Sequence, residues 1–120
     1  MSAEKSYGTT PITDEYMFEM LGKSKEYTVV VLNAGPNYDT PDAPATIFEH
    51  GRRNFALRAE GVLPIVCRVT DDSTCKGIGI FDVPLDEVIR IMDTDPGVQA
   101  GLFTYEAHPV RSFPGATLPG

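Results

Sequence analysis

The seven residues Tyr27–Asn33, YTVVVLN, decide the fold that this sequence predicts. They favour a β-strand, because β-branched residues are enriched in strands. Four apolar residues follow one another from Val29 to Leu32, so both faces of the strand are apolar. A strand of an antiparallel sheet with one solvated face would instead alternate apolar and polar side chains. Both faces of this strand are therefore expected to be covered.

The sequence that follows this strand predicts five further elements. Pro44 suits the first turn of a helix, and Gly61 stands where a C-terminal cap is expected. The elements are a helix over Ile47–Gly61, strands over Val62–Val69 and Gly77–Val83, a helix over Leu85–Asp93 and a strand over Leu102–Val110. The order βαββαβ predicts an α+β, ferredoxin-like sandwich, in which four antiparallel strands carry both helices on one face.

The sequence also predicts how the chain is organised. Residues 1–25 are expected to form an N-terminal extension, with a short helix that Thr13 caps and Gly22 ends. Residues 26–111 are expected to form the ferredoxin-like domain, followed by a Pro- and Gly-rich tail over 112–120. Two helices cover only one face of the sheet, so the apolar second face is expected to meet a second copy of the chain in a homodimer.

Charge and composition exclude several classes of function. The 120 residues include 10 Lys and Arg against 17 Asp and Glu, which gives a net charge of −7. That balance opposes binding to nucleic acid or to an anionic membrane surface, because both are negatively charged. No apolar run approaches the roughly 20 residues of a membrane span, and the N-terminus lacks the pattern of a secretory signal. A cytoplasmic location is therefore expected.

The sequence indicates neither a metal site nor a bound cofactor. Cys67 and Cys75 are the only cysteines, and their spacing fits no zinc or redox motif. Two unpaired thiols are the expected state in a reducing cytosol. The glycines at 77 and 79 lack the spacing of a phosphate-binding loop. The expected partners are a small-molecule ligand or substrate and a second copy of the chain.

The helix predicted over Ile47–Gly61 carries groups that a purely structural helix does not need. Its apolar side is formed by Phe48, Gly51, Phe55 and Ala59, with Leu57 on the flank. His50 and Asn54 fall within that apolar arc, so both are expected to point toward apolar neighbours. Gly51 in mid-helix costs about 1 kcal/mol relative to Ala, which indicates that the position needs a missing side chain.

Two further segments complete a pattern that begins with His50. Asp95–Gly101, DPGVQAG, follows the second helix of the domain, and His108–Val110 closes the last strand. Together these marks resemble the YCII-related (YciI-like) family over about residues 26–113. The resemblance implies a dimeric α/β barrel, in which two ferredoxin-like sheets face each other. It also implies that His50 and Asp95 form an acid–base pair in the cleft between helix and sheet.

The chemistry of these two residue types agrees with such a pair, although each also has a structural interpretation. Histidine titrates near neutrality and can accept and return a proton, while a carboxylate on its other ring nitrogen fixes the tautomer. Alternatively, Asp95 and Pro96 are a typical N-cap and first-turn pair of a short helix. His50 equally suits a hydrogen-bonded histidine of the core.

Arg53 and Asn54 are the expected substrate-binding residues. Arg53 projects near His50 and would hold an anionic substrate. Asn54 lies one turn after His50 and would hydrogen-bond a ligand or satisfy the strand beneath it. The proline-rich loop from Gly35 to Pro44 is either a lid over the pocket or a plain connector.

Two classes of function follow from these expectations. The first is a cofactor-independent enzyme of isomerase, lyase or dehalogenase type, in which His50 and Asp95 act on a small aromatic or carboxylated metabolite. Small enzymes of aromatic degradation, to which the YCII-related family is similar, carry out such reactions. The alternative is a non-catalytic module that binds a small ligand or regulates. A purely structural role would predict no ordered pocket.

Overall fold

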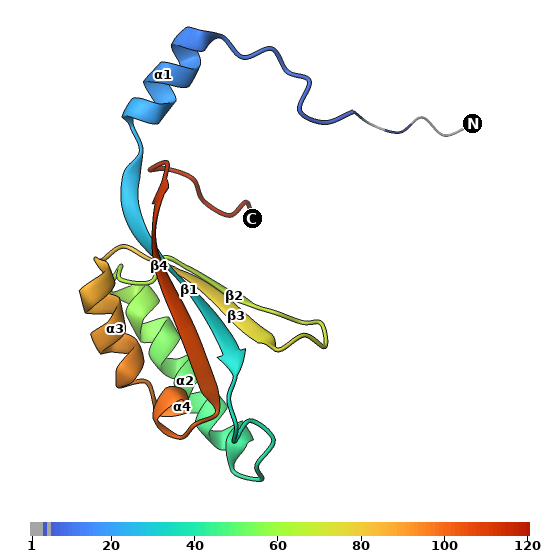
Figure 1. Cartoon of the computed structure of the whole chain (residues 1–120), viewed down its shortest axis with the longest axis vertical. Helices are drawn as coiled ribbons and strands as arrows, with labels where there is room; N and C mark the ends of the chain where they lie inside the picture. The colour runs from blue at the N-terminus through green and yellow to red at the C-terminus, as the bar shows by residue number, and fades with distance from the viewer. Residues whose placement is uncertain (1–3, 5) are drawn as a thin grey trace. The chain divides into compact units, whose positions relative to one another are not determined.

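The computed structural model describes residue 4 and residues 6–120, and the part of the expected N-terminal extension at residues 1–3 and 5 lies outside them. Glu26–Arg111 form one compact unit, and the described residues up to Lys25 form another with Ser112–Gly120. In chain order the elements are α1 (Asp14–Gly22), β1 (Lys25–Ala34), α2 (Ala43–Ala59), β2 (Ile65–Arg68), β3 (Cys75–Phe81), α3 (Leu85–Asp93), α4 (Pro96–Gln99) and β4 (Phe103–Ser112) (Figure 1).

The four strands form one antiparallel sheet in the order β2-β3-β1-β4. The hairpin of β2 and β3 places Ile65 opposite Ile80 and Arg68 opposite Gly77. β1 inserts beside β3, so that two strands adjacent in the sheet are separated by a helix and a strand in the sequence. This arrangement confirms the predicted α+β, ferredoxin-like fold.

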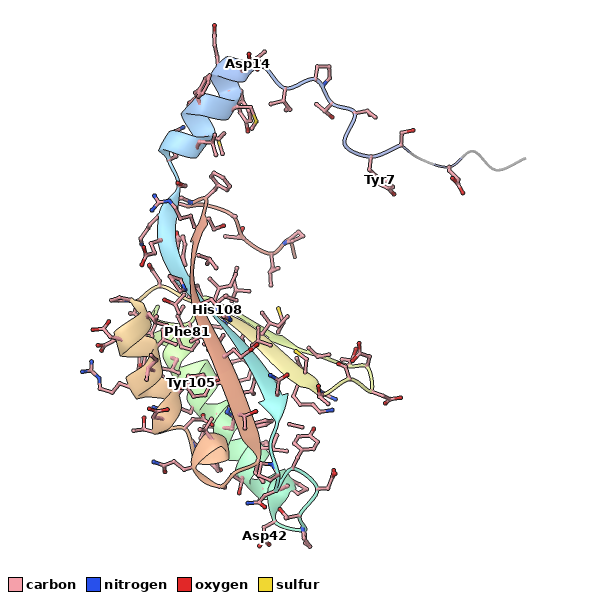
Figure 2. The ribbon with its side chains drawn as sticks, in the orientation of Figure 1. Tyr7, Asp14, Asp42, Phe81, Tyr105 and His108 are labelled. Atoms are coloured by element: carbon pink, nitrogen blue, oxygen red, sulfur yellow. The ribbon has the colours of Figure 1, made fainter. Side chains whose placement is uncertain are left out.

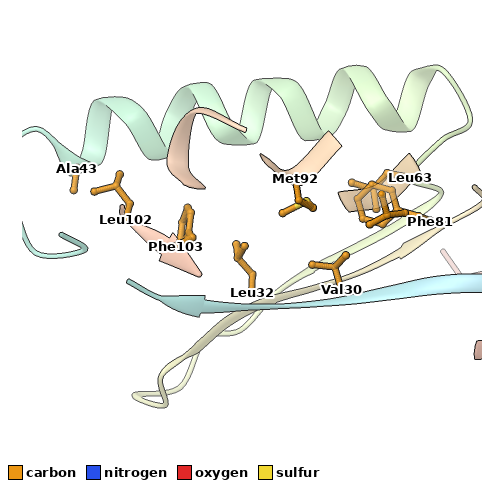
Figure 3. Close-up of a cluster of buried hydrophobic side chains, with 9 residues drawn as sticks. Val30, Leu32, Ala43, Leu63, Phe81, Met92, Leu102 and Phe103 are labelled. Carbon is orange, nitrogen blue, oxygen red and sulfur yellow. The ribbon is translucent and has the colours of Figure 1, made fainter. Parts of the chain in front are cut away.

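The core lies between the sheet and the helices α2, α3 and α4, which share one face of the sheet (Figure 1). Figure 3 shows the apolar side chains gathered between α2 and β1. The buried set is Val30, Leu32, Ala43, Leu63, Phe81, Val88, Met92, Leu102 and Phe103. Fully burying one such large side chain contributes about 1.5–3 kcal/mol, so this layer dominates the stability of the unit.

The second helix starts one turn earlier than predicted, at Ala43 in place of Ile47. Pro44 lies in its first turn, where a missing N–H costs nothing because no partner exists within the helix. Gly61 follows the C-terminal end with a φ of 77°, a left-handed conformation that favours glycine. The expectations for Pro44 in the first turn and Gly61 after the C-terminal end are therefore confirmed, although the helix spans Ala43–Ala59 in place of Ile47–Gly61.

Strand β2 is shorter than the predicted strand over Val62–Val69. The N–H groups of Val62 and Leu63 both donate to Leu57 O, at 2.9 and 3.1 Å, so these residues close the end of α2. Pro64 follows and has no N–H to give to a strand. The ladder with β3 therefore begins only at Ile65.

The apolar face assigned to α2 was wrong in part. Phe48 and Phe55 are each 67 % exposed, whereas Ala43 and His50 are buried. The helix turns inward the positions that repeat at intervals of three and four from Ala43, and Leu57 packs against the core as expected. Two of the inward positions, His50 and Asn54, are polar, so a pattern based on apolar residues alone does not identify this face.

The face of the sheet that carries no helix is apolar. Val29 lies opposite Ile80, and Ile65 lies opposite the same residue from the other side. The next row joins Val31, Ile78 and Cys67 in the same way. Ile78 is 41 % exposed, although it belongs to a central strand.

The first residues of the loop after β1 form hydrogen bonds with the residues before β4. Gly35 N donates to Leu102 O at 2.7 Å, and Asn37 N donates to Gly101 O at 2.9 Å. The Asn37 side chain adds a bond from Nδ2 to Ala100 O at 2.9 Å. These bonds hold the first part of the loop in place, which favours the connector over the lid.

The N-terminal helix α1 forms in the other unit. The Thr13 hydroxyl caps it by accepting from Tyr16 N at 3.1 Å, and none of its own residues is buried. Lys23 pairs with Glu19 one turn away at 3.0 Å. No helix among the described residues has both the length and the apolar character that crossing a membrane requires.

Candidate active site

His50 lies on the inner face of α2 and is only 8 % exposed. Its ring packs against the ring of Phe103, the first residue of β4, with the centroids 4.8 Å apart and the planes tilted by 46°. A buried imidazole needs a hydrogen-bond partner, because an unsatisfied polar group in the core costs about 1–3 kcal/mol.

That partner is Asp95, which is 45 residues away in the sequence and 2 % exposed. His50 Nδ1 lies 2.9 Å from both carboxylate oxygens of Asp95. Oδ2 also accepts from Gly97 N at 2.9 Å and from Val98 N at 3.2 Å. Asp95 is therefore both the N-cap of α4 and the hydrogen-bond partner of the histidine, so the capping role does not prevent the pairing with His50.

The carboxyl of Asp95 is held in its charged form. Burial opposes ionisation, but the hydrogen bond from His50, the charge of that ring, and the N–H groups of Val98 and Gly97 outweigh it. The pKa of Asp95 consequently lies below its usual value. A charged acceptor at Nδ1 stabilises the imidazolium that forms when the ring takes up a proton.

Acid is therefore expected to remove stability through this group. Because the folded pKa is lowered, the contribution is complete above the unfolded pKa of about 3.9 and is lost as the pH falls through the folded pKa. Urea unfolding between pH 6 and pH 3 measures the effect. Asp95→Asn should flatten this dependence, whereas Asp39→Asn, which changes an exposed loop carboxyl, should leave it as in the wild type.

The second ring nitrogen of His50 faces Asn54, one turn further along α2. Because Asp95 accepts at Nδ1, Nδ1 carries the hydrogen of the neutral ring and Nε2 keeps its lone pair. Asn54 Nδ2 lies 3.2 Å from Nε2 and donates to it. Both side chains line the same cavity, so the basic nitrogen is presented to a space that a ligand can enter.

Arg53 does not line that cavity, and its expected role as an anion binder is corrected here. Its Nη1 donates to Ile91 O at 2.7 Å and its Nη2 donates to Thr94 Oγ1 at 2.8 Å. Nη1 also lies 3.7 Å from Asp95 Oδ1. Arg53 thus ties α2 to the end of α3 and places a positive charge beside Asp95.

The cavity has a volume of about 530 Å³ and lies between α2 and the sheet. Known ligand pockets span about 300–1,000 Å³, so a small metabolite fits. Its walls are mainly apolar and include Val30, Leu32, Ile47, Leu63, Val66, Phe81, Met92 and Phe103. An ordered cavity of this size argues against a purely structural role.

Two glycines of β3 form part of the cavity lining. Gly77 and Gly79 lie on the same face as the buried Phe81, because residues two apart share a face of a strand. A Cβ at Gly79 would lie 3.0 Å from Leu63 Cδ1, so Leu63 packs directly over this glycine. A Cβ at Gly77 would lie 3.1 Å from Cys67 O, but the nearest side-chain atoms there, those of Leu32, are 3.9 Å away. Gly77 is therefore the more open of the two positions.

Gly51 also lines the cavity, but none of the described residues requires it to be glycine. A Cβ built there meets no atom within 4 Å. The missing side chain instead leaves free volume in the cavity. We expected a neighbouring group to require the absence of a side chain at Gly51. No such group is found among the described residues.

Sequence reasoning missed three residues of the cavity. Tyr38, from the loop after β1, packs on Phe103 with the ring centroids 5.9 Å apart. Arg68 on β2 and Lys76 on β3 line the cavity from the sheet, whereas the pattern that predicted the site lies on a helix. The spacing of Gly77 and Gly79 was the available signal, because a period of two places both on one face of a strand.

Comparisons with known proteins add little to this picture. No protein-family model matches the chain, and no curated protein matches it in sequence. Among solved structures, it is similar to 5-chloro-2-hydroxyhydroquinone dehydrochlorinase (TftG) from Burkholderia phenoliruptrix AC1100 in complex with 2,5-dihydroxybenzoquinone. The identity is 17 %, the TM-score is 0.49, and the match covers 68 % of this chain and 90 % of that chain. The fold is assigned from the strand order and register of the chain itself.

Proposed function

We propose that this protein is a cofactor-independent enzyme that moves a proton on a small aromatic or carboxylated metabolite. The observation that carries the proposal is the buried hydrogen bond between His50 and Asp95, which leaves Nε2 of His50 as a base on the wall of the cavity. A core histidine with a structural role alone would need no open volume beside its second nitrogen. The resemblance to the YCII-related family supports the same assignment of roles.

In the proposed reaction, the neutral ring of His50 removes a proton from the substrate at Nε2. The electron pair of the broken bond passes into a neighbouring carbonyl or expels a leaving group, and Asp95 stabilises the imidazolium meanwhile. Return of the proton to another atom completes an isomerisation. Expulsion of halide together with the removed proton completes an elimination, so both reaction types use one site.

Asn54 has a positioning role in this scheme. Its amide donates to Nε2 in the free protein, and this bond occupies the single lone pair of that nitrogen. A bound substrate therefore displaces the amide before Nε2 takes up a proton. Asn54 thus orients the ring until the substrate replaces it.

Proton exchange with solvent tests the proposal for either reaction type, because both begin with removal of a proton from carbon. A panel of hydroxy- and carboxy-substituted aromatic compounds and unsaturated lactones is incubated with the protein in D₂O and followed by NMR. An active compound should lose a C–H signal or yield an isomer or an elimination product, and His50→Gln should abolish this change. A compound that binds but emerges unaltered under single turnover would favour the ligand-binding alternative.

We also propose that the unit pairs with a second copy through the open face of its sheet. The rows around Ile78 and Ile80 are apolar, and a helix-free apolar face of this kind is expected to be covered. Light scattering should give twice the 13.1 kDa mass of one chain, and Ile78→Asp should restore the single mass. Ile89 on α3 is also 41 % exposed, so Ile89→Asp is the matched control and should stay paired.

A further inference from the structure

The charged residues that line the cavity are all of one sign. The chain as a whole has 17 Asp and Glu against 10 Lys and Arg. The described cavity lining nevertheless contains Arg68 and Lys76 together with His50, and it contains no Asp or Glu. An acidic protein has thus kept carboxylates off the surface that a ligand would touch, which favours an anionic ligand.

Arg68 reaches the cavity because of the register of the hairpin. It pairs with Gly77, which pairs in turn with Leu32, so the three residues share the inner face of the sheet. The side chain of Arg68 is exposed, and none of the described residues forms a hydrogen bond or an ion pair with it. Its guanidinium is free to bind the two oxygens of a carboxylate side by side.

Lys76 reaches the same cavity through an irregularity in β3. Leu32 pairs with Gly77 and Asn33 pairs with Cys75, so Lys76 is the extra residue of a bulge. A bulge re-aims its side chain, and Lys76 Nζ lies 5.0 Å from the centre of the Tyr38 ring. Nζ also donates to Ser73 O at 2.8 Å. The hydrogen bonds from Ser73 and, to a smaller extent, the charge of Lys76 lower the pKa of nearby Asp71.

A series of packed rings connects this charged end to the catalytic end of the cavity. Lys76 lies over Tyr38, Tyr38 packs on Phe103, and Phe103 packs on His50. Between the two ends, Gly77 presents backbone in place of a side chain, and the nearest side-chain atoms, those of Leu32, lie 3.9 Å from the position a Cβ would take. The space above Gly77 suits a flat apolar body.

We propose that Arg68 and Lys76 bind the carboxylate of an aromatic acid, whose ring lies over Gly77 with its far edge toward Nε2 of His50. This proposal rests on the proposed function only in that it assigns the catalytic role to His50. It names the substrate class as aromatic carboxylates and moves the anion site from Arg53 to β2 and β3.

Binding of a matched pair of probes tests the assignment, with 2-naphthoate as the acid and 2-naphthamide as its neutral counterpart. Calorimetry on the full chain should show the acid binding about tenfold or more tightly than the amide. Arg68→Gln with Lys76→Gln should abolish this preference, mainly by weakening the acid. Arg58→Gln, an exposed arginine of α2 outside the cavity, is the control and should retain it.

Equal affinity for the two probes, no binding of the acid, or a preference that survives the double substitution would each overturn the proposal. Failure of the proposed function is seen separately. His50→Gln should still prefer the acid, because the preference depends on charge at the other end of the cavity. If that preference is present but no compound is turned over, the anion site stands and the catalytic role of His50 does not.

Discussion

Replacing Asp95 with asparagine is expected to slow proton transfer by about 10³- to 10⁴-fold while keeping the cap of α4. Asparagine caps a helix as well as aspartate does, so its oxygen can still accept from Gly97 N and Val98 N. The amide nitrogen then faces His50 Nδ1 and donates to it. The ring must carry its hydrogen on Nε2 instead, and the base on the cavity wall is lost.

The comparison of three substitutions separates capping from catalysis. Asp95→Ala removes both roles and should cost about 0.5–2 kcal/mol of stability through the lost cap, together with the activity. His50→Gln should lose about 10²- to 10⁴-fold in rate and leave the α4 cap intact. Asp86→Asn, at an exposed carboxyl in the first turn of α3, is the control for charge. Rates come from exchange in D₂O and stabilities from urea unfolding; an active Asp95→Asn would remove Asp95 from the mechanism.

Much of the fold could be predicted because its signals are local. The run of apolar residues in β1 marks a strand buried on one side and apolar on the other. Helix α3 was predicted at its observed bounds, Leu85–Asp93, because Pro84 precedes it and polar and apolar residues alternate at helical spacing. The order of elements then leaves few topologies, since crossovers of this kind are right-handed.

The site could be predicted only in part, because its residues meet through tertiary structure. No pattern within either segment brings His50 on α2 to Asp95 before α4, and a resemblance to a family supplied that expectation. Arg53 was misassigned because a helical wheel shows direction but not the neighbouring carbonyl of Ile91 that takes its hydrogen bond. Lys76 depends on a bulge, which appears only when two strands are paired.

The opposite faces of α2 were confused for a related physical reason. A hydrophobic pattern assumes that large apolar residues are buried, yet Phe48 and Phe55 are each 67 % exposed, and Arg52 lies 5.2 Å over the Phe48 ring. The inward face instead carries a buried histidine satisfied by a distant carboxylate.

Tyr105 on β4, labelled in Figure 2, is another polar residue with a carboxylate partner. Its hydroxyl donates to Asp93 Oδ1 at 2.7 Å. Burial of Tyr105 and this bond raise its pKa to about 12.

Gly35→Ala is expected to destabilise the chain by about 3 kcal/mol or more. A Cβ at this position would lie 2.5 Å from Gly101 O and 3.0 Å from Leu102 C. Both are backbone atoms, and they cannot withdraw without breaking the bond from Gly35 N to Leu102 O. Leu102 is itself fixed in the core, next to the Phe103 ring that supports His50.

Gly51→Ala is the matched control and should have the opposite sign. The same methyl group is added, so the unfolded chain loses similar freedom in both variants. At Gly51 the methyl meets nothing within 4 Å and lies in mid-helix, where alanine is favoured over glycine by about 1 kcal/mol. Urea unfolding of the two variants should therefore differ by roughly 4 kcal/mol. Similar stabilities of the two variants would show that residues 100–102 can move away from the loop. The contact of the Phe103 ring with the His50 ring would then be less rigid than the close packing at Gly35 implies.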